Sequence, residues 1–288
     1  IKGSTNADTL QGGFGADTIS GLDGNDTIDG QAGSDSIDGG SGNDIIAGNF
    51  GNDTLKGSGG NDTVSDDSGS NLLDGGDGND NLTARSLTGN QTLIGGQGRD
   101  SLNAAGQNVN LDGGADNDTL RAEGRIYKTS QWQFTQNGNA SLQGGDGHDE
   151  LSAFSYSSVE LHGGRGNDRL RAGEYSAETS VQNARLFGEE GNDSLSSRIR
   201  GDVERYTGGN QNLDQSVLLD GGAGNDYLNA DTEYTSKQYG NTKVNAKGGD
   251  GNDRINVSSN NTWAGGVNSI DASGDTGNDN VQINSYNT

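Results

Sequence analysis

The chain of 288 residues contains no cysteine, no proline and no methionine. Without cysteine, disulfide bonds cannot contribute to its stability. The absence of proline suits a structure in which nearly every strand has a neighbour on both sides, because such strands need all their backbone N–H groups. No apolar run reaches membrane-spanning length, and neither a signal peptide nor an initiator methionine is present. We therefore expect a mature or excised segment that does not insert into a membrane.

Basic residues are also scarce. Lysine and arginine total 18 against 42 aspartates and glutamates, and the formal net charge is −24. A charge of this sign argues against nucleic acid and anionic membranes as partners. Only 27% of the residues are hydrophobic and 52 are glycine, so apolar burial is small while the entropic cost of ordering the backbone is large. This composition is typical of a disordered chain, unless something besides a hydrophobic core closes the structure.

A nine-residue pattern overturns that interpretation. From Gly12 it repeats six times in register, as GGFGADTIS, GLDGNDTID, GQAGSDSID, GGSGNDIIA, GNFGNDTLK and GSGGNDTVS. Each copy has an aspartate at position six and an apolar residue at position eight. The glycine-rich half can turn tightly, and the short strand that follows can point one apolar side chain into a core. A flexible linker would need no apolar residue at every ninth position.

This pattern resembles the calcium-binding nonapeptide of the repeats-in-toxin (RTX) family, GGxGxDxUx with an apolar residue at U. The resemblance implies an all-β fold, a right-handed parallel β-roll or β-solenoid in which stacked turns bind several Ca²⁺ ions. Each ion then lies between two turns and takes backbone carbonyls and the sixth-position aspartate from each. Two motifs make one coil of eighteen residues, so the turns form two rows on opposite edges.

The resemblance assigns one metal-ligating aspartate to each motif. The first row contains Asp8, Asp26, Asp44, Asp62, Asp80, Asp100, Asp118, Asp149, Asp168, Asp193, Asp226, Asp253 and Asp279. The second row contains Asp17, Asp35 and Asp53. Hard oxygen ligands suit Ca²⁺ better than Mg²⁺, which prefers to keep its waters.

Several turns depart from the motif, and we expect them to bind less well. Asn6 and Asp116 replace the fourth-position glycine, whose backbone freedom the turn needs. Ser58, Glu189 and Asp275 replace the second-position glycine.

Stacked aspartates repel one another unless a cation lies between them. At the strand spacing of about 4.8 Å, two carboxylates repel by roughly 0.9 kcal/mol even at the dielectric constant of water. A divalent cation between each pair converts this repulsion into attraction. We therefore predict that the chain is largely unfolded without calcium and that calcium folds it.

The regular array changes after its sixth full copy. Residues 66–74 keep the phase and the core residue Leu73, but Asn71 stands where the aspartate belongs, so we expect the second row to end there. From Asp80 onward one motif occurs per coil, at spacings of 18 to 33 residues. The sequence predicts a regular β-roll with two calcium edges over 1–83. Over 84–288 it predicts a wider β-solenoid with one calcium edge and variable loops on the other, in one continuous domain.

Period-two alternation continues through the longer strands. Inward side chains are expected two and four residues before a motif, at Val109, Leu111, Ala140, Leu142, Val159, Leu161, Ala184, Leu186, Val217 and Leu219. They are also expected two residues beyond the apolar position, at Ala84, Ala104, Ala122, Ala153, Ala172, Ala230, Val257 and Ile283.

Both tryptophans, Trp132 and Trp263, lie in predicted loops of the second part. The longest of these loops cover 123–138, 173–183, 198–216, 231–243 and 258–268. If the loops leave one edge, they form a side surface of aromatic, arginine and amide groups that could bind glycans.

The arginines of the second part allow two interpretations. Arg121, Arg165, Arg169, Arg171 and Arg185 can form a ladder of ion pairs with nearby glutamates on a solvated face. Alternatively, flanked by Tyr156 and Tyr175, they form a strip that recognises acidic sugars.

The remaining aromatic candidates are predicted to be exposed surface residues. His148 and His162 are interpreted as solvated side chains rather than zinc ligands or catalytic groups. Phe14 and Phe50 are placed at the third position of turns in opposite rows.

No compact group of residues outside the calcium turns indicates catalysis, so we expect no enzyme, no catalytic residues and no organic cofactor. The RTX resemblance implies a secreted bacterial protein, exported by type I secretion, that folds on external calcium. We expect it to act at the cell surface in an extracellular assembly such as a surface layer, adhesin or filament.

Two alternatives remain open. The segment can be the calcium-folded export and folding module of a larger RTX toxin or hydrolase. It can also be a glycan-binding module that holds cell-surface polysaccharide along the loop edge. Self-association is a further expectation, because residues 283–288 supply no amphipathic cap and uncapped solenoid ends favour stacking.

Overall fold

The computed structural model describes residues 1–86, 88–124, 127–128, 134–135, 137–173, 182–201, 214–234, 241–261 and 268–287. Strands and turns account for these residues, and no helix occurs among them. Accordingly, the described part of the chain has no helix long and apolar enough to span a membrane. The chain divides into two compact units, one of Ile1–Glu123 with Leu142–Glu150 and one of Gly124–Ser141 with Leu151–Thr288.

The strands of the first unit are short and regularly spaced. They are β1 (Thr9–Phe14), β2 (Thr18–Asp23), β3 (Thr27–Ala32), β4 (Ser36–Ser41), β5 (Ile45–Ala47), β6 (Thr54–Gly59), β7 (Thr63–Asp66), β8 (Asn71–Asp77), β9 (Asn81–Arg85), β10 (Asn90–Gln97), β11 (Ser101–Ala105), β12 (Asn108–Ala115) and β13 (Thr119–Glu123). Two further strands, β16 (Asn137–Asp146) and β17 (Glu150–Phe154), have residues in both units.

Most strands of the second unit are longer. They are β18 (Tyr156–Arg165), β19 (Arg169–Gly173), β20 (Asn183–Glu190), β21 (Ser194–Gly201), β22 (Gln215–Ala223), β23 (Tyr227–Tyr234), β24 (Thr242–Asp250), β25 (Arg254–Asn261), β26 (Asn268–Thr276) and β27 (Asn280–Asn287). A separate antiparallel pair is formed by β14 (Tyr127–Lys128) and β15 (Phe134–Thr135).

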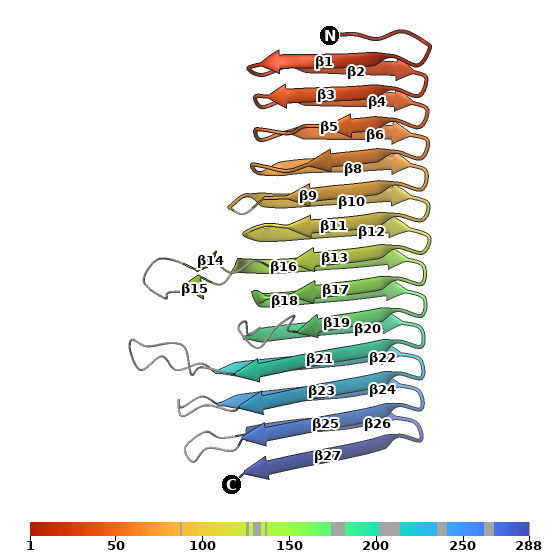
Figure 1. Ribbon diagram of the computed structural model, residues 1–288. Coiled ribbons are helices and arrows are strands. Elements are labelled where there is room, and N and C mark those ends of the chain that lie inside the picture. Colours follow the sequence, from red (N-terminus) through yellow and green to blue (C-terminus); the bar gives the residue numbers. More distant parts are fainter. Residues whose placement is uncertain are drawn as a thin grey trace. The chain divides into compact units, whose positions relative to one another are not determined.

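Alternate strands join alternate sheets. In the first unit, β1, β3, β5, β7, β9, β11 and β13 form one parallel sheet, and β2, β4, β6, β8, β10 and β12 form the other (Figure 1). Each strand pairs with the strand one coil further along the chain, since Ile19 pairs with Ile37 and Ile28 with Ile46. The second unit repeats this plan, with β19, β21, β23, β25 and β27 in one sheet and β18, β20, β22, β24 and β26 in the other. The predicted parallel β-roll of stacked strands is confirmed.

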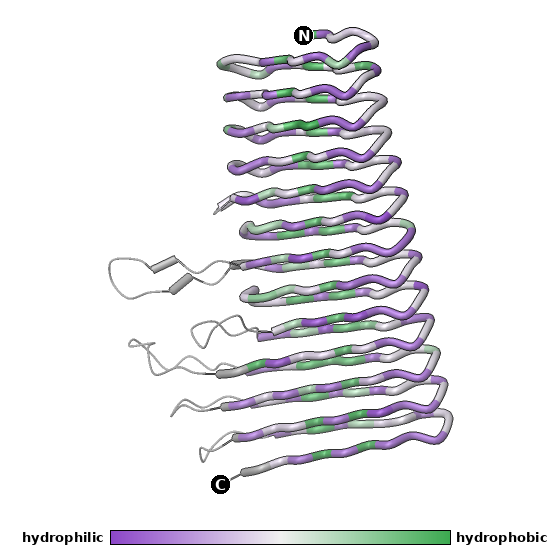
Figure 2. The backbone as a smooth tube through the Cα atoms, turned by 45° about the vertical axis from the view of Figure 1, so that its right-hand side comes forward, coloured by the Kyte–Doolittle hydropathy of each residue, from purple (hydrophilic) through white to green (hydrophobic). Residues whose placement is uncertain are grey.

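The core of each coil consists of the apolar residues that follow the turns. In the first unit the side chains of Ile19, Ile28, Ile37, Ile46, Leu55, Val64, Leu73, Leu82, Leu102 and Leu120 are buried. Most of them are the second residue of their strand. Figure 2 shows hydrophobic segments along the strands, whereas the turns are mostly hydrophilic or neutral. Alternation explains this arrangement, because successive side chains of a strand point to opposite faces and only one face meets the other sheet.

The inward positions predicted for the longer strands are also buried, with one exception. Leu111, Leu161, Ala172 and Val257 are 0–1% exposed, and the other predicted positions are similarly buried. Ile283 lies in register with Val257 but is 47% exposed, so the prediction that it is buried was wrong. No strand covers the far side of β27 among the described residues.

Strand length increases along the chain as expected. The strands β1 to β7 have three to six residues, whereas β18, β20 and β22 have ten, eight and nine. Most of the predicted loops lie outside the described residues, and so do Trp132, Trp263 and Tyr175.

Two placements of aromatic residues need correction. Tyr156 is buried at the start of β18, where it cannot flank an outer strip. Phe14 and Phe50 both pair with Ala32, so they lie in one column on the same edge and not in opposite rows. The distance of two coils between them in the sequence accounts for this.

Candidate calcium turns

Each turn connects the end of one strand to the start of the next in the other sheet. Between β2 and β3, the first strand ends at Asp23, Gly24 makes the bend with a φ of 120°, and Asp26 immediately precedes Thr27. The Asp26 side chain is 1% exposed, and its Oδ2 lies beside Gly21 of the same turn. The motif therefore places its single obligatory charge inside the turn.

One carboxylate oxygen of each aspartate joins successive coils. The backbone N–H of Asp26 donates to Oδ1 of Asp44 at 2.7 Å, and the N–H of Asp44 donates to Oδ1 of Asp62 at 2.7 Å. The same bond links Asp8, Asp26, Asp44, Asp62, Asp80, Asp100, Asp118 and Asp149 in the first unit, and Asp168, Asp193, Asp226, Asp253 and Asp279 in the second. It also links Asp17, Asp35 and Asp53 in the second row.

The stacking of turns survives long insertions. Asp118 and Asp149 are 31 residues apart, and Asp193 and Asp226 are 33 apart, yet each pair keeps a 2.7 Å bond. The extra residues between motifs therefore leave the calcium edge unchanged.

The second carboxylate oxygen has no partner. Among the described residues, Oδ2 is buried without a hydrogen bond in Asp26, Asp35, Asp44, Asp53, Asp62, Asp80, Asp100, Asp118, Asp193, Asp226 and Asp253. Asp8, Asp17 and Asp279 are less buried. A buried carboxylate oxygen without a donor is costly, so this recurring feature indicates a cation-binding site.

The first-position glycine keeps space open beside that oxygen. A Cβ built at Gly21 would collide with Asp26 Oδ2 and with the carbonyl oxygen of Gly39 in the next coil. A Cβ built at the other first-position glycines would meet the same two groups, which are the aspartate of the same turn and the first-position carbonyl of the next coil. These glycines are Gly3, Gly12, Gly30, Gly39, Gly57, Gly75, Gly95, Gly113, Gly163, Gly188, Gly221 and Gly248. Carboxylate and carbonyl oxygens are the ligands that Ca²⁺ prefers. These residues therefore fit calcium.

The described residues contain no group of three or more His, Asp and Glu side chains that could hold a metal. This agrees with the donor set above, in which backbone carbonyls supply part of the coordination and each turn adds only one carboxylate.

Burial makes the charged form of these aspartates unfavourable. It raises the pKa of Asp118 to about 8; the hydrogen bond from the N–H of Asp100 opposes this rise, and the carboxylates of Asp100 and Asp149 add to it. For the same leading reason the pKa is raised to about 7 at Asp100 and Asp193 and to about 6 at Asp62. A divalent cation would offset both burial and mutual repulsion.

Most turns have a positive φ at the second and fourth positions, but Ser4 and Asn6 of the first turn do not. Asp116, Ser58, Glu189 and Asp275 replace glycine there and adopt φ of 75°, 83°, 77° and 63°. Leu22, Gln31 and Asn49 do the same at the second position, although the sequence analysis did not identify them as departures. The backbone of the turn is thus kept at these positions, at a cost of about 1–2 kcal/mol per residue. Whether they bind calcium less well stays a prediction.

Asparagines at the fifth position form a second ladder that the sequence analysis missed. Asn25 Oδ1 accepts from the N–H of Asn43 at 2.8 Å, and Asn43 Oδ1 accepts from the N–H of Asn61 at 2.6 Å. In this ladder the N–H of the later coil donates to the earlier coil, whereas in the aspartate ladder the N–H of the earlier coil donates to the later one. The recurring Asn-Asp pair in the motif is the signal that could have revealed it.

The second row ends in a different arrangement. Asn71 Oδ1 accepts from the N–H of Asp53 at 2.9 Å, so the ladder continues for one more step. Asn71 Nδ2 donates to Asp66 Oδ1 at 2.7 Å. Asp66 is buried, and its Oδ2 has no partner. An aspartate where the first-position glycine belongs was the sequence signal for this residue.

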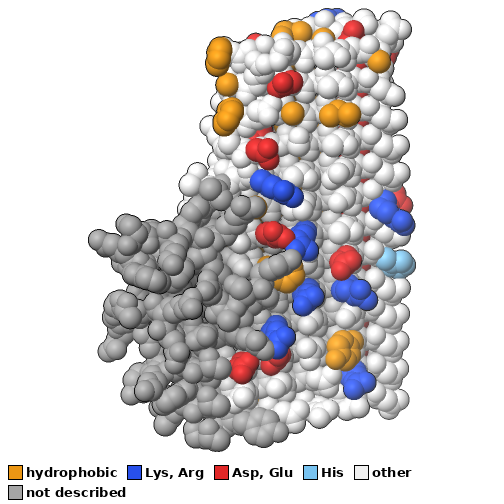
Figure 3. Space-filling view, in the orientation of Figure 1, with side chains coloured by type: hydrophobic (Ala, Val, Ile, Leu, Met, Phe, Trp, Pro, Cys, Tyr) orange, Lys and Arg blue, Asp and Glu red, His pale blue; other side chains and the backbone are white. Residues whose placement is uncertain are grey.

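The arginines of the outer faces lie beside carboxylates. Arg185 is 3.5 Å from Glu160, and Arg165 is 3.6 Å from Glu190. Figure 3 shows basic and acidic side chains intermixed on the visible described surface, without a large patch of either sign. These pairs are exposed, and they bear out the ion-pair interpretation for the residues concerned.

The two histidines lie outside the turns' interiors. His148 is exposed at the fifth position of its turn. His162 stacks on Phe187 at 4.7 Å and is 2.9 Å from Glu189 and 3.1 Å from Glu160. Arg185 covers the same ring at 5.4 Å. The aromatic ring of Phe187 is therefore already occupied by neighbours of this chain.

The family model described as the RTX calcium-binding nonapeptide repeat (four copies) matches residues 2–37, 23–55, 56–86, 87–120, 160–174 and 215–232, which together make up more than half of the chain. The chain belongs to the RTX calcium-binding repeat family. It is a calcium-binding repeat protein, built on a structural repeat fold. Comparisons with curated proteins and with solved structures gave no match.

The RTX geometry extends beyond the matched residues. The turns of Asp149, Asp193, Asp253 and Asp279 lie outside the match, yet the aspartate ladder includes each of them. The bond pattern thus identifies repeats in which the spacing has become irregular.

Proposed function

We propose that this RTX chain is a calcium-dependent structural protein, in which Ca²⁺ ions between stacked turns complete the fold. The ligands in this proposal are the sixth-position aspartates of both rows, together with first-position carbonyls. The observation that carries it is the repeated pairing of a buried, unpartnered Oδ2 with a space that only glycine leaves open.

The proposal includes where folding occurs. RTX repeats are typical of secreted proteins, and extracellular calcium modules bind in the range of about 10⁻⁴ to 10⁻³ M. At the much lower calcium of a bacterial interior the buried aspartates would stay uncompensated. The chain would therefore leave the cell unfolded and fold outside, in a surface layer, adhesin or filament.

A calcium titration followed by far-ultraviolet circular dichroism tests this. The expected midpoint lies at about 0.1–1 mM calcium. A midpoint below about 1 µM would mean that the chain folds before export and would contradict the proposal. Sedimentation of the calcium-loaded protein tests assembly, and a monomer at high protein concentration would count against it.

A calcium-folded module of a larger RTX toxin or hydrolase is the second candidate. In its favour, the described residues hold no cluster of three or more His, Asp and Glu side chains for a metal, and Arg165 and Arg185 lie beside glutamates of this chain. The full-length gene distinguishes the two, because a long additional domain would favour the module.

Glycan binding along the loop edge rests on residues outside those described. A glycan array with variants at Trp132 and Tyr206 tests it. The described outer face gives it little support, since Phe187 lies between His162 and Arg185.

A further inference from the structure

The last turn of the second row differs from every other described turn in its oxygen donors. In the row's earlier turns, a Cβ at Gly12 or Gly30 would meet the aspartate of the same turn and a backbone carbonyl of the next coil. At Gly48 a Cβ would instead collide with the carboxylate oxygen Oδ2 of Asp66, and it would lie 2.7 Å from Oδ2 of Asp53. Two carboxylates therefore border this space.

Both carboxylates are enclosed and incomplete. Asp53 is 2% exposed and Asp66 is 1% exposed. Oδ2 of each is buried and accepts no hydrogen bond. Two buried negative oxygens that border one space, without a donor or a basic side chain, need a positive charge between them.

The surrounding hydrogen bonds hold Asp66 in this orientation. Its Oδ1 accepts from the N–H of Ser68 at 2.9 Å and from Asn71 Nδ2 at 2.7 Å. Asn71 Nδ2 also donates to the Ser68 carbonyl at 2.9 Å. Because Oδ1 is doubly satisfied, only Oδ2 is left to face Gly48.

Asn71 has a positioning role that an aspartate could not perform. Its Oδ1 accepts from the N–H of Asp53, as an aspartate would, while its amide donates to Asp66. A carboxylate at position 71 has no donor and would repel Asp66. In this copy of the motif the sixth position therefore carries a neutral amide, and the carboxylate stands at the first position instead.

We propose that Asp53 and Asp66 bind one further Ca²⁺ ion, in a site that closes the second row with two side-chain carboxylates. The inference rests on the proposed calcium role of the other turns and adds a ligand, Asp66, that the nonapeptide motif does not contain. Two carboxylates and one divalent cation give a neutral site, and two hard oxygens beside glycine suit Ca²⁺.

The direct test uses the unaltered protein, crystallised in millimolar calcium. An anomalous difference map is expected to show a peak between Asp53 Oδ2 and Asp66 Oδ2, beside Gly48. An empty position in a crystal whose other turns hold calcium would overturn the site and would leave the proposed function intact. Peaks at none of the turns would instead refute the proposed function.

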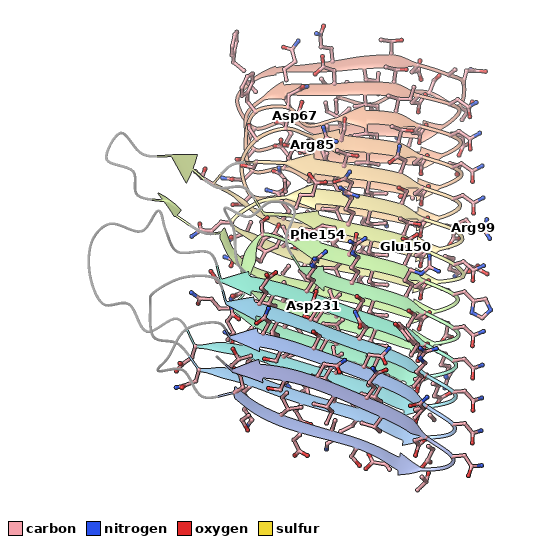
Figure 4. The ribbon with its side chains drawn as sticks, turned by 60° about the horizontal axis from the view of Figure 1, so that its bottom comes forward. Asp67, Arg85, Arg99, Glu150, Phe154 and Asp231 are labelled. Atoms are coloured by element: carbon pink, nitrogen blue, oxygen red, sulfur yellow. The ribbon has the colours of Figure 1, made fainter. Side chains whose placement is uncertain are left out.

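Ion counting provides the matched comparison. Asp66→Asn is expected to bind one calcium ion fewer than the unaltered chain, as counted by native mass spectrometry. The control is Asp67→Asn, which removes the same charge from the exposed neighbouring residue at the edge of the first unit (Figure 4) and is expected to keep the full count. Equal counts in both variants would mean that a shared proton, and not calcium, joins the two carboxyls. If Asp66→Asn does not fold, the map of the unaltered protein decides.

Discussion

Gly39 is the first residue of a calcium turn and lies against Asp44 Oδ2 and the carbonyl of Gly57. We predict that Gly39→Ala weakens calcium binding at this turn, because the methyl group occupies the space proposed for the ion. Overpacking of about 1–3 kcal/mol corresponds to a loss of about 5- to 150-fold in affinity. Calorimetric titration of the variant measures this loss.

Gly59→Ala is the control for that change. Gly59 lies at the third position of a neighbouring turn, where a Cβ would only make an ordinary contact at 3.9 Å with the Gly40 carbonyl. Its calcium affinity should equal that of the unaltered chain. Equal losses in the two variants would show that glycine is needed for flexibility alone.

The aspartates predict a dependence on pH in the absence of calcium. Burial raises the pKa of Asp62, Asp100 and Asp118 to about 6, 7 and 8 in the folded chain, against 3.8 when unfolded. Raised values mean that the folded form binds protons more readily, so its stability is highest below about pH 4 and is lost as pH rises through about 6 to 8.

In excess chelator we therefore expect more β-structure at pH 5 than at pH 8 by circular dichroism. Calcium competes with these protons, so its apparent affinity should rise over the same interval. A chelated chain with the same spectrum at both pH values would contradict the assignment of raised pKa values.

The sequence predicted the charged residues of the site better than its backbone. The motif placed each of these aspartates in a turn, by a period of nine up to Asp62 and by the motif alone after it, and the ladder of hydrogen bonds joins them. Their binding of calcium stays a prediction. The positive φ of Leu22 and Gln31 could not be predicted from the sequence, because neither residue type favours it. Asp66 was missed although it replaces a first-position glycine, because its orientation depends on a hydrogen bond from Asn71 that the motif does not contain.

At the scale of a strand, β8 offers a comparison of neighbouring leucines. Leu73 is 0% exposed and Leu72 is 38% exposed. We predict that Leu73→Ala lowers the free energy of unfolding of the calcium-loaded protein by about 2–5 kcal/mol. Leu72→Ala should change it by less than about 1 kcal/mol. Urea denaturation at fixed calcium checks both, and equal effects would contradict the assigned register.

Alternation predicted the strands well, because each buries one face against a single opposing sheet. Val109, Leu111 and Val159 were placed inward from spacing alone. Tyr156 was misplaced because it follows Ser155, whose φ of 65° turns the chain and resets the alternation. A reset of this kind has no signature in the period of the motif.

At the scale of the whole chain, the sequence predicts the division into parts less well than it predicts the strands. The change from two calcium edges to one after residue 83 stays a prediction, and the boundaries of the two compact units fall elsewhere in the sequence, after residues 123, 141 and 150. The net charge of −24 bears on the chain as a whole. Each bound Ca²⁺ offsets two of these charges, so folding and charge neutralisation are expected to occur together.

The central claim is that calcium folds this chain. The most direct measurement is a far-ultraviolet circular dichroism spectrum at neutral pH, recorded in millimolar calcium, then in excess chelator, and again after calcium or magnesium is restored. We predict a β-sheet spectrum in calcium, its loss in chelator, and its recovery with calcium but not with magnesium. An unchanged β-sheet spectrum in excess chelator would contradict the claim.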